Sequence, residues 1–146
     1  MIMRSLVFFI FLLMVTMACN TTENATKSGK PDLTGTYWKL VELMGKPFKG
    51  TSATGKEMYI TLSADSSTVQ GHGGCNSFRG KYEVKEGGRI SFSSLASTMM
   101  ACPDMDNEAT FMKAIGSADN YIITGNSLQL NKARMAPLAR FEAVKK

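Results

Sequence analysis

Five side chains in two short segments could bind a soft metal ion. His72 stands three positions before Cys75, and Met99, Met100 and Cys102 follow together in a later segment. Thiolate and thioether sulfur suit Cu(I), and Zn²⁺ takes thiolate and imidazole. The chain holds one histidine, however, and no second spaced pair of ligands. A Cu or Zn site at these residues is therefore the alternative hypothesis, and no cofactor is predicted.

The same residues could also supply a nucleophile or a redox pair. A Cys75 nucleophile with His72 as its base needs a third group to orient the imidazole, and the sequence offers no candidate. Cys75 and Cys102 lack the C-x-x-C spacing of redox pairs. We therefore predict no catalytic residues and a non-enzymatic protein. An uncharacterised hydrolase is a further alternative, with no residue assigned to it.

The first nineteen residues have the pattern of a lipoprotein export signal. The apolar run 6–15 follows Arg4 and would span about 15 Å as a helix, half of a ~30 Å hydrocarbon core. Thr16-Met17-Ala18-Cys19 then resembles the lipobox of lipoprotein signal peptidase, with Thr16 where Leu or Val is commoner. We predict a signal peptide over 1–18 and a lipid on Cys19. An ordinary signal peptide cut near Ala18 is the alternative.

Residues 19–31 are expected to form a tether between the lipid and a domain at 32–146. The tether sequence is rich in Thr, Asn, Lys, Ser and Gly and has no large apolar residue, which is typical of disordered segments. Asn20, rather than the Asp that retains enterobacterial lipoproteins on the inner membrane, follows Cys19. The predicted location is therefore the cell envelope, with the outer membrane favoured.

Composition and charge indicate a globular domain that does not bind nucleic acid. Hydrophobic residues make up 44% of the chain, charged residues 20%, and the formal net charge is +5. A nucleic-acid interface would gather its basic residues on one surface. Here they are scattered through the sequence: Lys46, Lys49, Lys56, Arg79, Lys81, Lys85, Arg89, Lys132, Arg134 and Arg140.

Short strands separated by turns are predicted through most of the domain. Alternation at 58–62 places Met58, Ile60 and Leu62 on one face. Alternation at 78–85 directs Phe78, Tyr82 and Val84 inward and leaves the charged side chains outside. Further strands are expected at 36–43, 89–93 (burying Ile90 and Phe92), 121–124, 127–130 and near 138–144, with turns at 86–88 and 125–126.

One helix is expected after Pro103. Asp104 is a suitable N-cap, and Asp106 and Glu108 would favour the positive end of the helix dipole. Phe111, Ile115 and Ala118 form a narrow apolar stripe at helical spacing, and Gly116 weakens the last turn. The elements together predict a mainly β domain with one helix packed on an antiparallel sheet.

Two cysteine-centred motifs in a fixed order resemble the META domain, or HslJ-like, family of bacterial envelope proteins. The resemblance covers roughly residues 32–141. Its residues are Leu33, Gly35, Thr36, Trp38 and Leu40, then Gly71, Gly73, Gly74, Cys75, Asn76, Phe78, Gly80 and Tyr82, then the run Ser97-Thr98-Met99-Met100-Ala101-Cys102-Pro103, and finally Glu108, Phe111, Tyr121, Gly125, Leu128 and Leu130.

The resemblance implies a small antiparallel β-barrel-like fold with a helix, and a disulfide between Cys75 and Cys102. Closing a loop of that length stabilises a domain by about 3.5 kcal/mol on the chain-entropy model. Met99 and Met100 would then pack in the core or beside the disulfide, and the glycines at 71–74 would permit positive φ at a bend or bulge. The resemblance implies no reaction.

The leading hypothesis is therefore a membrane-anchored lipoprotein with a non-catalytic META-like domain. Its partner would be an envelope protein, or a lipid or other apolar ligand inside the barrel. HslJ itself is associated with heat shock and antibiotic tolerance, and members of the family are often envelope lipoproteins, so the resemblance makes tolerance of envelope stress the expected physiological context.

Overall fold

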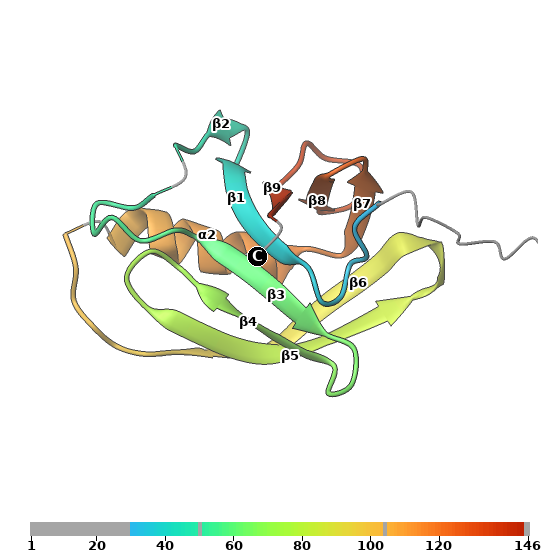
Figure 1. Ribbon diagram of the computed structural model, residues 1–146, viewed down its shortest axis with the longest axis horizontal. Helices are drawn as coiled ribbons and strands as arrows, with labels where there is room; N and C mark the ends of the chain where they lie inside the picture. Colours follow the sequence, from blue (N-terminus) through green and yellow to red (C-terminus); the bar gives the residue numbers. More distant parts are fainter. Residues whose placement is uncertain (1–29, 50, 104, 145–146) are drawn as a thin grey trace, which may run out of the picture.

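The computed structural model describes residues 30–49, 51–103 and 105–144. Within them lie nine strands and one α-helix (Figure 1). The predicted signal peptide, Cys19 and most of the predicted tether lie outside the described residues. The elements are β1 (Tyr37–Leu43), β2 (Lys46–Pro47), β3 (Tyr59–Ser63), β4 (Thr68–His72), β5 (Ser77–Lys85), the 3₁₀ turn η1 (Glu86–Gly88), β6 (Arg89–Ser97), α2 (Met105–Ser117), β7 (Asn120–Thr124), β8 (Ser127–Asn131) and β9 (Ala139–Val144).

The strands form one antiparallel sheet that closes into a ring. Each strand from β3 to β8 pairs with the next one along the chain, and β1 pairs with both β3 and β9. The weakest junction is β6–β7, where the one matched pair is Arg89 with Asn120. The predicted class, mainly β with one helix in a barrel-like arrangement, is confirmed.

The interior of the ring is filled by side chains from alternate strand positions. Trp38, Leu40, Ile60, Leu128 and Leu130 are each fully buried. Phe111 of α2 makes edge-to-face contacts with Phe78 and Phe141, at ring-centre distances of 6.0 and 6.2 Å. Because such aromatic pairs add to the burial of their apolar area, the helix and both sides of the ring share one core.

Val84 is the inward position that the alternation pattern places wrongly. Phe78 and Tyr82 are buried as predicted, but Val84 is 42% exposed. It lies one residue before the end of β5, where the β5–β6 hairpin runs past the core (Figure 1). Strand parity sets the side of the sheet on which a side chain lies, and burial also needs a neighbour to cover it.

Strand β4 is an element that the sequence patterns did not predict. It lies between β3 and β5, and Gly71 pairs with Ile60 on one side and Phe78 on the other. A Cβ on Gly71 would stand 2.1 Å from the Tyr59 carbonyl oxygen and 2.8 Å from the Phe78 ring. Glycine is therefore required here for close approach rather than for the positive φ that the sequence suggested.

Helix α2 crosses behind the sheet and contacts β6, β1 and β9 (Figure 1). Its buried side chains are Glu108, Phe111, Ala114 and Ile115, so the predicted stripe is present. Ala118 is also buried, although it lies one residue beyond the helix end. Asp104, the predicted N-cap, lies outside the described residues. Among the helices of the described residues, none has the length and apolar character needed to cross a membrane.

Candidate functional site

The two cysteine-bearing segments meet beside the first turn of α2. One is the loop between β4 and β5, which carries Cys75, and the other is the connection from β6 to α2, which carries Cys102. A disulfide joins them across 27 positions, with the Cα atoms 6.0 Å apart. The structure therefore contains the bridge that the family resemblance implied.

Glu108 turns inward from α2 and holds the β4–β5 loop. Its Oε2 accepts hydrogen bonds from the backbone N–H of Cys75 (2.9 Å) and of Asn76 (2.6 Å). Its Oε1 accepts a hydrogen bond from the Asn76 side-chain amide at 2.7 Å. Because the side chain is 6% exposed, these bonds replace most of the hydration that the carboxylate loses on burial.

Asn76 connects the same loop to the Cys102 segment. Its Oδ1 accepts hydrogen bonds from the Thr98 hydroxyl (2.7 Å) and the Met100 N–H (2.8 Å), while its Nδ2 donates to the Met100 carbonyl at 3.1 Å as well as to Glu108. Both donors and both acceptor positions of the amide are thus occupied. We call Glu108, Asn76 and the Cys75–Cys102 disulfide the cysteine cluster.

The glycines around Cys75 make room for this cluster. A Cβ on Gly73 would lie 2.7 Å from Glu108 Cγ and 2.9 Å from its Oε2. Gly74 has a φ of +100°, in the region that L side chains rarely adopt. Gly74 therefore fits the positive-φ prediction, whereas Gly73 is needed because the Glu108 side chain passes directly over it.

The protonation of Glu108 and His72 follows from their surroundings. Burial raises the pKa of Glu108, but the hydrogen bonds from Asn76 and Cys75, with nearby His72, outweigh it and hold the pKa below its ordinary 4.5. Burial, together with the positive charge of Lys56, lowers the pKa of His72 from its ordinary 6.5 in spite of Glu108. The Gly74 N–H donates to His72 Nδ1 at 3.0 Å, which requires that nitrogen to be unprotonated.

The five residues of the soft-metal hypothesis lie in one region, but they do not form a ready ligand set. The sulfurs of Cys75 and Cys102 are bonded to each other. Met99 is 98% exposed and Met100 51% exposed, so the core alternative for these methionines is wrong. Met100 lies beside the disulfide, the other predicted position, with its carbonyl oxygen 3.4 Å from Cys75 Sγ. In the described residues, no three His, Cys, Asp or Glu side chains are grouped as metal ligands. Metal binding at these positions would require the disulfide to be reduced first.

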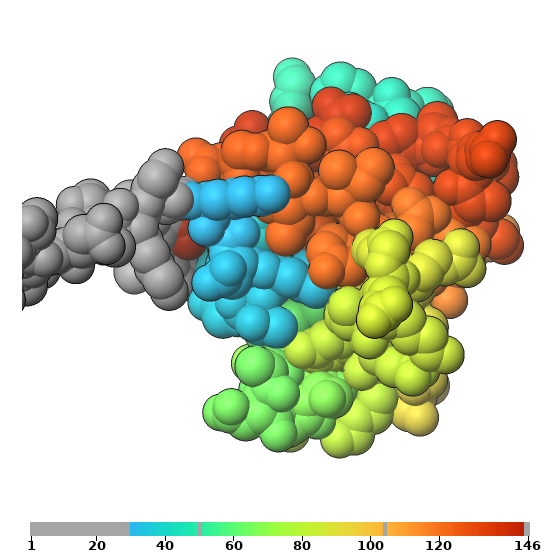
Figure 2. Space-filling view, turned by 90° about the vertical axis from the view of Figure 1, so that its right-hand side faces the viewer, coloured from blue at the N-terminus to red at the C-terminus, as the bar shows by residue number. Residues whose placement is uncertain are grey.

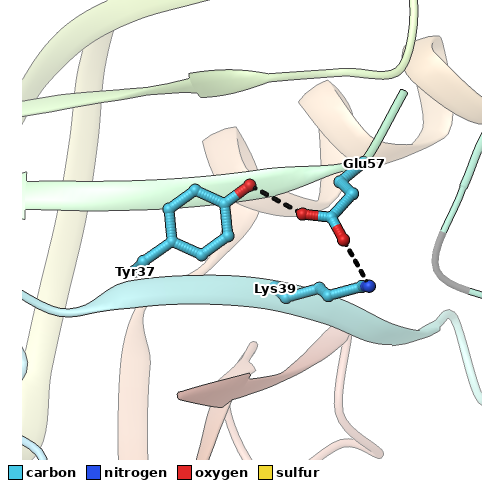
Figure 3. Close-up of polar contacts among 3 residues, drawn as sticks. All are labelled: Tyr37, Lys39 and Glu57. Atoms are coloured by element: carbon cyan, nitrogen blue, oxygen red, sulfur yellow. Dashed lines mark hydrogen bonds and ion pairs between the residues drawn. The ribbon is translucent and has the colours of Figure 1, made fainter. Parts of the chain in front are cut away.

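A second polar group lies outside the ring, on β1, the first residue of β3 and the segment that leads into β3. Glu57 accepts a hydrogen bond from the Tyr37 hydroxyl at 3.1 Å and forms an ion pair with Lys39 (Figure 3). The ring of Tyr37 stacks on Tyr59 with the centres 4.4 Å apart. Partial burial, with the contact to Glu57, raises the pKa of Tyr37 above its ordinary value, so the phenol stays protonated and acts as a hydrogen-bond donor.

Two hollows mark the outer surface near the β3–β4 turn. One, of about 430 Å³, lies beside Thr34, Thr61 and Asp65. The other, of about 450 Å³, lies over β4, β5 and β6 and is bordered by Arg79 and Lys81. Neither was predicted from the sequence, because each depends on how neighbouring strands are paired.

The inward role of Glu108 was also missed, although a signal for it exists. The sequence interpretation assigned Glu108 to the helix dipole. Positions 108, 111 and 115 nevertheless lie on one helical face, and Phe111 and Ile115 are the buried apolar residues of that face. A carboxylate in line with a buried stripe predicts a buried hydrogen-bonded role, because an unpaired charge would not be tolerated there.

A closed antiparallel sheet with one helix across it defines a class of small β-rich domains, and here a buried carboxylate of the helix and a disulfide to the segment before it hold the same sheet loop. Within that class, the chain belongs to the META domain family, whose model matches residues 31–145. The Trp38, Phe78, Tyr82 and Phe111 positions of the family motif lie in the core. Asn76, Cys75 and Cys102 lie in the cysteine cluster, and the flanking Ala101 and Pro103 are exposed.

Solved structures support the same fold. A protein from Burkholderia xenovorans, solved by NMR, is 25% identical and matches with a TM-score of 0.62 over 83% of this chain and 96% of that one. A crystal structure of a DUF4847 family protein from Bacteroides vulgatus is 17% identical, with a TM-score of 0.53 over 78% of this chain and 96% of that one. No curated protein matches the chain at a significant level.

Proposed function

We propose that the chain is an exported lipoprotein, held on an envelope membrane by acylated Cys19, whose META domain binds a ligand or a protein partner and catalyses no reaction. The observation that carries the non-catalytic part is the saturation of the cysteine cluster. The side-chain polar atoms of Glu108 and Asn76 form hydrogen bonds with the protein's own backbone and side chains. A general base needs a free lone pair within reach of a substrate, and these groups hold the fold instead.

Two observations support export. The apolar run and the cysteine at position 19 have the form of a lipoprotein signal. Disulfides persist in oxidising compartments outside the cytosol, and Cys75 and Cys102 are placed to form one. A chain anchored at Cys19 would carry its domain on the short polar tether, and Asn20 favours the outer membrane.

Binding at the outer surface is favoured over binding inside the ring. Trp38, Phe111 and Phe141 are fully buried and occupy the interior, so an apolar ligand there would have to displace core side chains at a cost of several kcal/mol. The hollows described above open on the outside. The Met99–Met100 segment, held by Asn76, also presents exposed apolar side chains that a protein partner could cover.

The anchor is tested with a Cys19→Ser variant of the full chain. We expect the wild-type protein in the membrane fraction, with a mature N-terminal peptide whose mass includes the acyl groups. The Cys19→Ser variant should be absent from the membrane fraction, and its N-terminal peptide should carry no acyl groups. The double variant Cys75→Ala with Cys102→Ala is the matched control, because it also removes cysteines but should keep the lipid. An unmodified Cys19, or a Cys19→Ser variant that stays in the membrane fraction as the wild type does, would contradict the proposed anchor.

The binding role is tested by mass spectrometry of the full chain purified from the envelope in neutral detergent. A native mass that exceeds the denatured mass by a defined amount identifies a bound ligand. A turnover activity that is lost on a single polar substitution in a folded protein would overturn the non-catalytic assignment.

A further inference from the structure

The hollow over β4, β5 and β6 is created by an irregularity in strand pairing. Arg79 pairs with Ala96 and Lys81 with Ser93, so two residues of β6 lie opposite Gly80. This is a β-bulge, and Ser94 has the positive φ (52°) that accompanies the local kink. The bulge reverses the strand parity, because Leu95 now lies against Gly80, with Leu95 Cδ2 2.6 Å from where a Gly80 Cβ would be.

The consequence is a depression on the outer face between two cationic side chains. Ser94 and Ala96 contribute only small side chains to this face, whereas the Gly80 position is directed inward, toward Leu95. Arg79 and Lys81 stand on either side because residues two apart in a strand project to the same face. The lining of the hollow, about 450 Å³ in volume, consists of Ser66, Thr68, Arg79, Gly80, Lys81, Ser94 and Ala96.

The charge in this hollow is not balanced by a carboxylate. Within the described part of the chain, the ion pairs join Lys39 to Glu57, Lys85 to Glu83 and Arg140 to Glu42, and none involves Arg79 or Lys81. Glu83, the acidic neighbour of Lys81 on the same face, already pairs with Lys85 at 3.5 Å. Lys81 donates one hydrogen bond to the Ser66 carbonyl at 3.2 Å and keeps further N–H donors for a ligand.

Hydroxyl groups complete the lining. Ser66 Oγ and Thr68 Oγ1 lie 2.6 Å apart, and Ser94 is the third hydroxyl residue of the lining. A guanidinium, an ammonium and three hydroxyls offer more donors than the two oxygens of a carboxylate can accept. They suit the several oxygens of a phosphate group, which arginine binds through two parallel hydrogen bonds.

We propose that the bulge hollow is a binding site for a phosphate group, carried either by a lipid headgroup or by a soluble phosphate ester. The inference rests on the proposed binding role and names its ligand class, but it does not depend on the lipid on Cys19. The described start of the chain, the β3–β4 turn and the β5–β6 hairpin share one face of the molecule (Figure 2). If Cys19 carries a lipid, the short tether keeps the domain near a membrane, and headgroup phosphates are a nearby source.

The test titrates inorganic phosphate into the full chain in neutral detergent at constant ionic strength, with backbone amide NMR shifts as the readout. We expect saturable shifts centred on residues 66–68, 79–81 and 93–96. Arg79→Gln and Lys81→Gln should each weaken binding at least about fivefold, the effect of losing roughly 1 kcal/mol of charge-assisted hydrogen bonding. Arg134→Gln and Lys46→Gln, at exposed basic positions away from the hollow, are the matched controls and should leave the affinity unchanged.

A second arm adds phosphatidylglycerol to the detergent micelles and follows the same amide shifts, so that the anchor is in a micelle in every variant. Shifts at the hollow that are lost in the Arg79 and Lys81 variants alone identify a headgroup site. Phosphate binding without a response to phosphatidylglycerol identifies a soluble ester, and it also supports the site. Shifts that match those caused by equal chloride, or equal losses in all four variants, would overturn it. Retention of the wild-type chain in the membrane fraction reports separately on the anchor, so the two proposals can fail independently.

Discussion

Glu108 and Asn76, which are 32 positions apart, are joined by two hydrogen bonds, one to each carboxylate oxygen. The Asn76 N–H reaches Oε2 at 2.6 Å and the Asn76 amide reaches Oε1 at 2.7 Å. The residue before Asn76 is the disulfide cysteine Cys75, whose N–H also binds Oε2. The covalent link and the charged hydrogen bonds therefore fix the same loop, and each can be removed separately.

Glu108→Gln is predicted to lower the free energy of unfolding by about 3 kcal/mol. The carboxylate accepts three hydrogen bonds, whereas a glutamine must direct an NH₂ group at some of the same donors and leave them unpaired, at about 1–3 kcal/mol each. Urea unfolding of the oxidised proteins measures the change. Glu83→Gln, at an exposed carboxylate, is the control and should stay within about 0.5 kcal/mol of the wild type. Equal stability of the two variants would show that the cluster is dispensable.

Removal of the disulfide by Cys75→Ala with Cys102→Ala is predicted to cost about 2–5 kcal/mol and to leave the fold intact. The bridge closes a loop of 27 positions, and its loss restores conformational entropy to the unfolded chain. Thermal unfolding followed by circular dichroism measures the cost. Wild-type protein unfolded in excess reductant should show a similar loss. An unchanged melting temperature in both experiments would mean that the bridge contributes nothing to stability.

The strands were predictable where one local pattern decided the outcome. The 125–126 turn and its flanking strands, and the buried Ile90 and Phe92, follow from alternation and turn chemistry. Strand β4 was missed because Gly71 gives it no apolar alternation. The β6 bulge and the hollow over it were missed because they depend on the register between β5 and β6, which a single strand does not encode. The role of Glu108 depends on a partner loop distant in sequence.

Acidification is predicted to destabilise the domain in two stages. The pKa of His72 is lowered in the folded state, so below its ordinary value of about 6.5 the unfolded chain binds a proton that the folded chain does not. Stability is therefore full above pH 7 and falls as the pH drops toward the folded-state pKa, by at most about 1.4 kcal/mol per pH unit. The pKa of Glu108 is also lowered, and its contribution is lost in the same direction below its ordinary 4.5.

His72→Gln separates the two stages. Glutamine can still accept the Gly74 N–H through its side-chain oxygen but does not titrate. The free energy of unfolding of this variant, measured by urea titration, should be nearly constant between pH 7 and pH 5. The same titrations continued below pH 4.5 should still show the loss that Glu108 causes. The same slope between pH 7 and 5 in wild type and variant would assign that slope to groups other than His72.

Two glycine-to-alanine substitutions are predicted to act in opposite directions. Gly73→Ala places a methyl group 2.7 Å from Glu108 Cγ, and Glu108 cannot move away without giving up its bonds to Cys75 and Asn76. We expect a loss of about 2–3 kcal/mol, comparable to overpacking in a core. Gly116→Ala lies inside α2, where the added Cβ meets Leu95 at an ordinary contact distance of 3.5 Å. Alanine should stabilise the helix there by about 0.5–1 kcal/mol. The urea midpoints of unfolding of the two variants, compared with that of the wild type, measure both changes. A Gly73→Ala domain as stable as the wild type would mean that Glu108 can leave the loop at little cost, and the account of the cysteine cluster would then be wrong.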